Sequence, residues 1–167
     1  RSFWWLHIIG IFAFLNYLYY SKHLHILLAF PNTYFANLEI KGKFRVNPNI
    51  KTEVQLMLNP QASIPESSST IPERFGATDV FDLSWVQLMN SYSCTECGRC
   101  SSECPANITG KKLSPRAIMM KTRDRLEEVG ENINKNGGKF ISDGKQLLND
   151  YIKPDELWAC TSCNACV

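Results

Sequence analysis

Residues 94–105 read CTECGRCSSECP, and residues 160–166 read CTSCNAC. The first stretch spaces its cysteines as C-x2-C-x2-C-x3-C-P, and the second repeats the first three positions of that pattern. All seven cysteines of the chain lie within these two runs. An odd number of cysteines confined to one part of a chain does not suit a secreted disulfide framework, so the two runs are interpreted as metal ligands.

The spacing of the first run is typical of chains that bind [4Fe–4S] clusters. Two residues between successive cysteines allow three thiolates to reach three irons of one cluster, whereas the fourth cysteine, which is followed by proline, ligates the other cluster. The cysteines then divide into two ligand sets: Cys104, Cys160, Cys163 and Cys166 for one cluster, and Cys94, Cys97 and Cys100 for the other. A fourth ligand for the second of these sets is expected just past Val167.

Structural zinc is the main alternative to two clusters. Zinc sites usually combine two C-x-x-C pairs in a tetrahedral set, which the triplets and the cysteine–proline step fit poorly. Gly98 is expected to allow the backbone to approach a cluster closely. Arg99, Lys111 and Lys112 are positive charges that would raise a cluster's potential, although such side chains are more often simply solvated.

The N-terminal part of the chain is strongly apolar. Residues 3–30 read FWWLHIIGIFAFLNYLYYSKHLHILLAF, with Lys22 as the only fully charged side chain. About 20 apolar residues cross a bilayer core, so residues 1–30 are predicted to form one continuous transmembrane helix. Lys41, Lys43 and Arg45 follow it, which favours a cytoplasmic location for the C-terminal side. A buried helix of a soluble protein and a cleaved signal peptide are the alternatives.

Two histidines in this segment are candidate ligands of b-type haem. His7 and His25 lie 18 residues apart, which on one continuous helix is five full turns, or about 27 Å along the axis. Both side chains would then share one face, with one histidine near each leaflet, as a di-haem helix requires. His23 would point elsewhere and is not expected to be a ligand.

Residues 31–75 are predicted to connect the two parts of the chain as a membrane-surface collar followed by a flexible linker. Pro31 is expected to stop the preceding helix, and residues 31–58 are expected to be irregular. Residues 59–74 contain three prolines and four serines with little to bury, which is typical of a flexible segment.

Residues 76–167 are predicted to form a helical domain with two [4Fe–4S] clusters, truncated at its C-terminal end. Four helices are expected: one capped by Ser84, one capped by Ser114 and ending at Gly130, one capped by Ser142 or Asp143 and reaching Ile152, and one from Pro154 towards Trp158. No strand-like alternation persists here. The predicted fold class is therefore mainly α, with the end of a transmembrane domain preceding a ferredoxin-type domain.

Composition narrows the range of partners. The net charge is only +2, from 18 basic and 16 acidic side chains, so no strong field favours nucleic acid. The chain opens on Arg1 and stops at Val167, inside a cysteine pattern, and we expect it to be a piece of a longer protein. It contains no nucleophile–base pair, phosphate loop or nucleotide fingerprint that would indicate a substrate site.

The two signals together resemble a known family. The segment from His7 to His25 resembles the last di-haem helix of the respiratory nitrate reductase gamma subunit and of the heterodisulfide reductase membrane subunit. Residues 94–119, CTECGRCSSECPANITGKKLSPRAIM, resemble the iron–sulfur subunit of membrane-bound heterodisulfide reductase and its bacterial relatives. The chain lacks the other membrane helices and the cysteine-rich domain of that family, so the resemblance leaves the substrate and the direction of electron flow open.

The resemblance implies an electron-transfer component of a membrane-bound oxidoreductase. Electrons would pass between a membrane b-haem or quinone site and a cytoplasmic redox subunit, such as one with cysteine-rich domains, through the two clusters. The protein would lie at the cytoplasmic membrane, with the cluster domain on the cytoplasmic side. Two alternatives are the iron–sulfur subunit of a quinone-linked dehydrogenase and a membrane-anchored iron–sulfur redox sensor.

Overall fold

A computed structural model describes residues 1–39, 46, 48–59 and 76–166 of the chain. The elements are α1 (Ser2–Leu18), α2 (Leu24–Tyr34), α3 (Pro48–Leu58), η2 (Val80–Asp82), α4 (Trp85–Ser93), α5 (Arg99–Ser102), α6 (Pro105–Ile108), α7 (Pro115–Lys135), η3 (Leu147–Tyr151) and α8 (Pro154–Trp158). Within these described ranges, the only β pairing is an isolated bridge between Leu148 and Ile152. The predicted mainly helical fold is confirmed.

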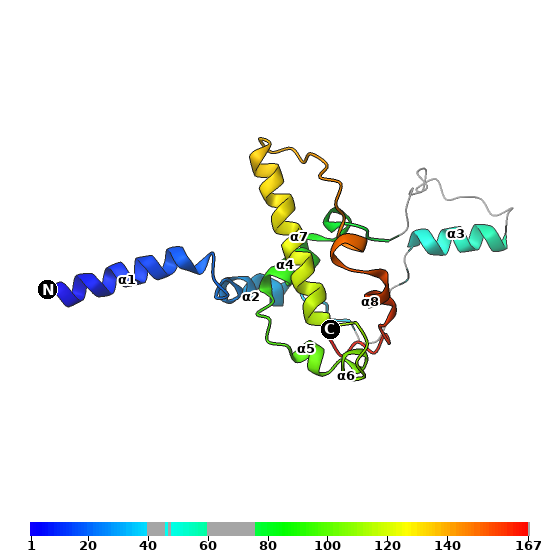
Figure 1. Ribbon diagram of the computed structural model, residues 1–167, viewed down its shortest axis with the longest axis horizontal. Coiled ribbons are helices and arrows are strands. Elements are labelled where there is room, and N and C mark those ends of the chain that lie inside the picture. The colour runs from blue at the N-terminus through cyan, green and yellow to red at the C-terminus, as the bar shows by residue number, and fades with distance from the viewer. Residues whose placement is uncertain (40–45, 47, 60–75, 167) are drawn as a thin grey trace.

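The longest helix, α7, crosses the body of the molecule beside α4 (Figure 1). Ser114 caps it by accepting a hydrogen bond from the amide of Ala117, and Pro115 occupies the first turn, as predicted. The predicted end at Gly130 is wrong, because the helix continues to Lys135. A glycine inside a helix costs only about 1 kcal/mol, and the packing of Ile133 against the core on the far side of Gly130 outweighs that cost.

A small apolar core lies between α7 and the two short elements η2 and η3. Its buried members are Val80, Val129, Leu147 and Ile152. A backbone hydrogen bond links the two short elements of this core. The amide of Leu148 in η3 donates to the carbonyl of Thr78, just before η2, at 2.9 Å. The core runs along α7 from Ile118 to Ile133, and α5, α6 and the C-terminus lie near the N-terminal end of α7 (Figure 1).

Arg125 of α7 is fully buried beside this core. Its guanidinium donates to both carboxylate oxygens of Asp79, at 3.1 and 2.8 Å, and to the Lys145 carbonyl at 2.7 Å. It also forms an ion pair with Asp143. A buried charge persists only when it is paired and hydrogen-bonded, and here partners from two segments far apart in sequence meet that condition.

The contact with Arg125 explains why the helix predicted from residue 142 or 143 to Ile152 is wrong. Asp143 is used as a partner of the guanidinium rather than as a helix cap. The only turn in this stretch, η3, is irregular, with Leu148 and Asn149 in non-helical conformations. Tertiary contacts thus override the local helix signal here.

The apolar N-terminal segment is two helices and not the single helix predicted for residues 1–30. α1 ends at Leu18, and α2 begins at Leu24. Ser21 lies in the break, where its hydroxyl donates to the Leu18 carbonyl at 3.1 Å and accepts from the amide of His23 at 3.2 Å. Such local side-chain bonds offer the backbone an alternative to the helical pattern. Among the described residues, no helix combines the length and the apolar composition needed to cross a membrane.

α2 continues beyond its predicted end and packs on the part of the molecule that contains the cysteine runs. It passes through Pro31 and ends at Tyr34. Its partner is α4, and the rings of Phe35 and Trp85 meet edge to face at 4.6 Å. Ser84 caps α4 as predicted, in a reciprocal arrangement with Gln87. The ring contact helps to hold α2 against α4, the helix that leads into the first cysteine run.

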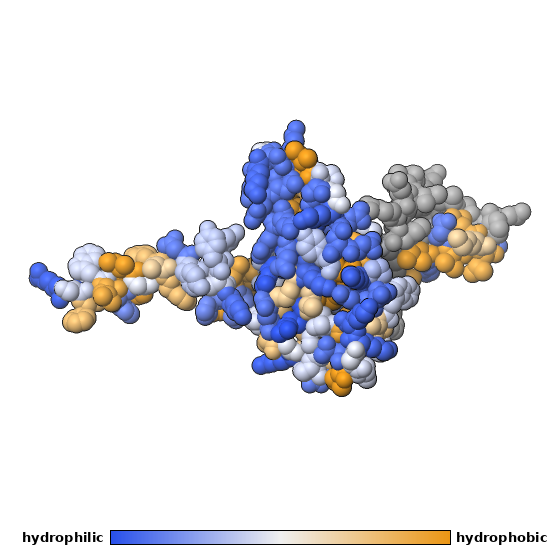
Figure 2. All heavy atoms as spheres, in the orientation of Figure 1, coloured by the Kyte–Doolittle hydropathy of each residue, from blue (hydrophilic) through white to orange (hydrophobic). Residues whose placement is uncertain are grey.

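The predicted collar differs from the structure at residues 48–58, which form α3 and are not irregular. Most of the predicted flexible linker, residues 60–75, lies outside the described residues. Figure 2 shows apolar side chains gathered on α1 and α3, while the visible face of the body is largely hydrophilic. The exposed apolar side chains of α3 are Ile50, Val54, Met57 and Leu58.

Candidate metal centre

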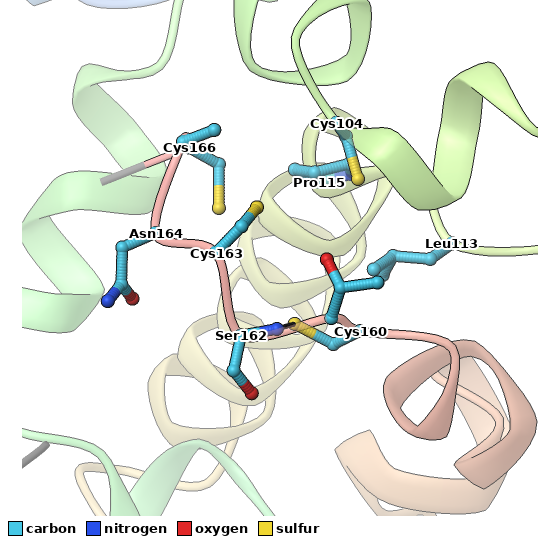
Figure 3. A pocket seen from close by; sticks show the side chains of 10 residues that line it. Cys104, Leu113, Pro115, Cys160, Ser162, Cys163, Asn164 and Cys166 are labelled. Carbon is cyan, nitrogen blue, oxygen red and sulfur yellow. Dashed lines mark hydrogen bonds between the residues drawn. The ribbon is translucent and has the colours of Figure 1, made fainter. Parts of the chain in front are cut away.

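Four cysteines line one cavity of about 60 Å³ between the α6 region and the end of the described chain (Figure 3). Cys104 comes from the first run, and the other three are the complete second run, Cys160, Cys163 and Cys166. Leu113 and Pro115 also line the cavity. All four thiols are free, and they are the four cysteines that the sequence pattern assigns to one cluster.

Cys104 reaches this cavity because it precedes a proline-started helix in a tightly packed corner. It is the N-cap residue of α6, and Pro105 fixes the first helical position. Cys104, Ala106 and Leu113 form a small buried cluster against which Ala159 packs. Since Ala159 directly precedes Cys160, this contact brings the second run to Cys104.

A second contact holds the helix before the second run in place. Lys121 of α7 donates to both carboxylate oxygens of Glu156 in α8, at 2.8 and 2.7 Å. Both side chains are largely shielded from solvent. Because α8 ends just before Cys160, this ion pair helps to fix the start of the second run relative to α7.

The two runs share the same backbone conformation. In the first run Glu96 and Gly98 have φ values of 59° and 82°, and in the second run Ser162 and Asn164 have φ values of 54° and 57°. These left-handed residues flank the middle cysteine of each run and turn the chain so that its thiols can converge. A Cβ atom on Gly98 would meet nothing within 4 Å, so its dihedral angle, rather than close approach, calls for glycine there.

The middle thiol of each run receives matching hydrogen bonds. The amide of Arg99 and the side chain of Thr95 bond to the Cys97 thiol and lower its pKa. The amide of Ala165 and the side chain of Thr161 do the same at Cys163. Hydrogen bonds of this kind stabilise thiolates and help to set the potentials of iron–sulfur clusters. Sequence reasoning missed these donors, although the threonine after the first cysteine of both runs was a visible signal.

Cys100 connects the two runs electrostatically. Cys166 is exposed as a residue, but partial burial of its thiol raises its pKa, and the nearby thiols of Cys160, Cys104 and Cys100 add to that shift. Of the three cysteines assigned to the other cluster, Cys94 and Cys100 are half-buried and Cys97 is exposed. Because Cys104 itself lines the four-cysteine cavity and α5 contacts α6, the first run lies beside that cavity.

Charged side chains surround the first run. Glu96, between Cys94 and Cys97, accepts a hydrogen bond from Arg123 of α7 at 2.8 Å, and this contact lowers the pKa of the Glu96 carboxyl. Lys22 and Arg116 act on the same carboxylate from further away. Lys22 lies in the break between α1 and α2, so the apolar segment comes close to the first run at this point.

The structure contradicts the geometry predicted for the two candidate haem ligands. His7 lies on α1 and His25 on α2, so the five continuous turns that would align them do not exist. The Nδ1 atom of His25 is 2.6 Å from the Lys22 carbonyl, and the His23 ring contacts Phe14 edge to face. The break at residues 19–23, which the sequence did not reveal, removes the argument from helical phase.

The donor set around the cavity fits an iron–sulfur cluster. It consists of four thiols and no histidine or carboxylate, which is the usual ligation of [4Fe–4S] clusters. Within the part of the chain that the structure describes, no three His, Cys, Asp or Glu side chains are grouped closely enough to hold one metal ion. Cluster ligands are spaced more widely than the ligands of a single ion, because each binds a different iron.

Comparison with known proteins gives the same class of site. Residues 93–167, which include both cysteine runs, match the family model of the 4Fe–4S dicluster domain. This part of the chain thus resembles an iron–sulfur domain, and both cysteine runs lie within the matched residues. The chain as a whole resembles iron–sulfur oxidoreductases.

Three relatives show that resemblance. The chain is 30% identical over 98% of its length to the probable iron-sulfur-binding oxidoreductase FadF of Bacillus subtilis, covering 24% of that protein. It is 25% identical over its whole length to the EtfAB:quinone oxidoreductase of Syntrophomonas wolfei, covering 23% of it. Over 52% of its length it is 31% identical to a probable membrane-anchored ferredoxin of Chromohalobacter salexigens, covering 15% of that protein.

The chain spans about a quarter or less of the length of these curated relatives. No solved structure matches it significantly. The comparisons support an electron-transfer component of an iron–sulfur oxidoreductase.

Proposed function

We propose that this chain carries electrons through two [4Fe–4S] clusters between a membrane quinone and a redox partner on the cytoplasmic side. The observation that carries the proposal is the cavity where Cys104 meets all three thiols of the second run. When bound, such clusters supply one-electron transfer. The protein supplies thiolate ligands, the left-handed turns that orient them, and the hydrogen bonds that stabilise their charge.

The ligands follow from this arrangement. One cluster is held by the four cavity cysteines, Cys104, Cys160, Cys163 and Cys166. The other is held by Cys94, Cys97 and Cys100 of the first run. The matching backbone conformation of the two runs supports the second assignment, because the same turns that converge the thiols at the cavity recur in the first run. Crossed ligation through Cys104 keeps the two clusters close enough to exchange electrons.

The relatives' names support a quinone as one redox partner. One relative is an EtfAB:quinone oxidoreductase, and another is a membrane-anchored ferredoxin. By analogy, electrons from EtfAB or from a cysteine-rich redox subunit pass through the clusters to quinone. The second candidate function is that of an iron–sulfur component of a quinone-linked dehydrogenase. The name EtfAB:quinone oxidoreductase favours this role over a heterodisulfide-reductase-like role.

The apolar N-terminal segment is proposed to attach the protein to the cytoplasmic membrane. Most of its large side chains are exposed in α1, including Phe3, Trp4 and Phe12, which suits an apolar surrounding. The contact of α2 with α4 holds the first cysteine run next to this segment. The proposed route does not require haem at His7 or His25.

Cluster content and its loss in single variants test the proposal. The intact protein, purified without oxygen, is expected to contain about eight irons and eight acid-labile sulfides, as two cubane clusters demand. Cys104→Ser is expected to remove the electron paramagnetic resonance signal of one cluster, and Cys97→Ser that of the other. A Ser101→Ala variant is the control and should retain both signals.

Electron transfer is tested separately from cluster content. Dithionite-reduced protein is mixed with a short-chain quinone, and reoxidation of the clusters is followed by their visible absorption. Rapid reoxidation supports the quinone as partner. Zinc without labile sulfide would overturn the cluster assignment, and clusters that quinone fails to oxidise would overturn the route.

A further inference from the structure

The two cysteine runs differ in charge and in little else. They share the left-handed turns, the threonine donor and the amide donor to the middle thiol. At the position where the first run has Glu96, the second has Ser162, whose amide bonds to the Cys160 thiol at 3.4 Å. Backbone geometry and hydrogen bonds should therefore affect the reduction potentials of both sites similarly. The clearest difference between the two runs is in their charged side chains.

The loop of the first run carries two charges, Glu96 and Arg99, and Glu96 belongs to an ion pair. Glu96 lies inside the ligand loop, and Arg123 of α7 binds it with an Nη2–Oε1 distance of 2.8 Å. The two side chains are only 33% and 25% exposed, so water screens them less than a pair at the open surface. Burial works against the charge of Arg123, yet its hydrogen bond to Glu96 raises its pKa overall. Both side chains are charged at neutral pH.

The second run has no corresponding charge in its ligand loop. The groups that shift the pKa of Cys163 are hydrogen-bond donors and burial, and the charged groups that act on Cys166 are other thiols. Two ion pairs involve α8 before the second run, Lys112 with Asp155 and Lys121 with Glu156, and neither lies between two cysteines.

Resting on the proposed function, we infer that Glu96 and Arg123 set the reduction potential of the cluster in the first run, with opposite signs. Reduction of a [4Fe–4S] cluster from the 2+ to the 1+ state takes up one electron and adds one negative charge. A carboxylate in the ligand loop disfavours that added charge, whereas a guanidinium beside it favours it. Both are tuning residues and not ligands.

Removing the charge of either residue of this ion pair should therefore shift the potential of the first cluster in opposite directions. Glu96→Gln removes a negative charge and raises the potential of the first cluster. Arg123→Gln removes a positive charge and lowers it. Each shift is expected to be about threefold to tenfold in the equilibrium constant for reduction, where tenfold corresponds to about 59 mV for a one-electron couple. A purely structural effect of breaking the pair would move both variants in the same direction.

The experiment is a redox titration of the intact protein followed by electron paramagnetic resonance, in which the two clusters are told apart by the cysteine variants described above. Arg123→Lys keeps the charge and should leave the potential nearly unchanged. Lys135→Gln breaks an exposed pair at the far end of α7 and serves as the matched control. The potential of the second cluster should change little in any of these variants.

The outcomes separate the inference from the proposed function. Protein that contains no iron or sulfide would overturn both. Two intact clusters with no shift, with shifts of the same sign in Glu96→Gln and Arg123→Gln, or with equal shifts at both clusters would overturn the inference alone. If Arg123→Gln fails to fold, a negative or absent shift in Glu96→Gln is sufficient to overturn it.

Discussion

Two regions are held in shape by different means: the body, which consists of η2, α4, α7 and η3, and the two cysteine runs. Around Arg125, an irregular loop is fixed by the protein's own side chains, which join Asp79, Asp143 and the Lys145 carbonyl to one buried guanidinium. The second cysteine run has little such support: Cys160, Cys163 and Cys166 are exposed, and the packing that reaches it comes mainly through Ala159. The body is built to keep its form alone, whereas the runs rely on what their thiols bind.

Removal of iron is expected to produce the largest effect. Chelation of the anaerobic protein should abolish amide protection from hydrogen exchange in residues 94–104 and 160–166, because the bound cluster is what holds these loops. Amides near Val129 should stay protected, since their core contains no cysteine. Equal loss of protection in both regions, measured by mass spectrometry, would show that the body also depends on the clusters.

Arg125→Leu is the corresponding test of the body. The change leaves two carboxylates without their cation in a shielded site, which typically costs about 3 kcal/mol or more. The midpoint of urea unfolding, followed by circular dichroism, should fall accordingly. Lys135→Leu, which breaks an exposed pair on the same helix, should change stability by less than about 0.5 kcal/mol. Similar losses in the two variants would contradict the role given to Arg125.

Acidity should weaken the same contact. Hydrogen bonds from Arg125 lower the pKa of Asp143 to about 2. Burial favours a higher pKa at Asp79, but its bonds to Arg125 and to two backbone amides lower it overall. A carboxyl whose pKa is lower when folded stabilises the protein above its ordinary pKa, and this contribution is lost as pH falls.

The pH window for this loss runs from about 4 to about 2. The stability difference between the natural protein and Asp143→Asn is therefore expected to shrink as pH falls through it. Acid damages the clusters of both proteins equally. Taking the difference in stability between the two proteins at each pH therefore removes this contribution. A difference that stays constant across this window would show that the Asp143 charge contributes nothing.

The smallest expected effect concerns the threonine donors. Thr95→Val and Thr161→Val each remove one hydrogen bond to a middle thiolate and should lower the potential of the cluster in the same run. Each shift should be smaller than that from Arg123→Gln, because a dipole is lost rather than a full charge. Potentiometric titration should show two shifts of similar size at different clusters. A shift at the wrong cluster would contradict the equivalence of the two runs.

Structural features that depend on a few neighbouring residues were predicted well from the sequence. Ser84, Ser114 and Pro115 mark helix starts through bonds made within one turn, and the structure has helices there. The cysteine spacing is likewise local, and it grouped Cys104 with the second run, whose cysteines line the same cavity; ligation of a cluster by these four stays a prediction. Such features need no knowledge of distant residues.

Errors arose where distant contacts or a single polar side chain decided the outcome. Asp143 has the chemistry of a helix cap, but its partner Arg125 is visible only in the folded chain. A single serine, Ser21, within an apolar stretch did not indicate a helix break. In the structure its hydroxyl donates to the backbone carbonyl of Leu18, where α1 ends. The argument for His7 and His25 assumed an unbroken helix, which the structure does not have, so haem ligation by these residues stays a prediction without support from helical phase.

The position of Cys104 also bears on the order of assembly. Along the chain, α6, α7, η3 and α8 separate it from Cys160, so the four thiols of the cavity meet only after these elements have folded. In the unfolded chain, each cysteine run offers its own neighbouring thiols to iron, and the cost of closing so long a loop keeps the distant ligand away. On the proposed ligation, folding of α7 would precede completion of this cluster, and the inserted cluster would cross-link the two ends of that loop.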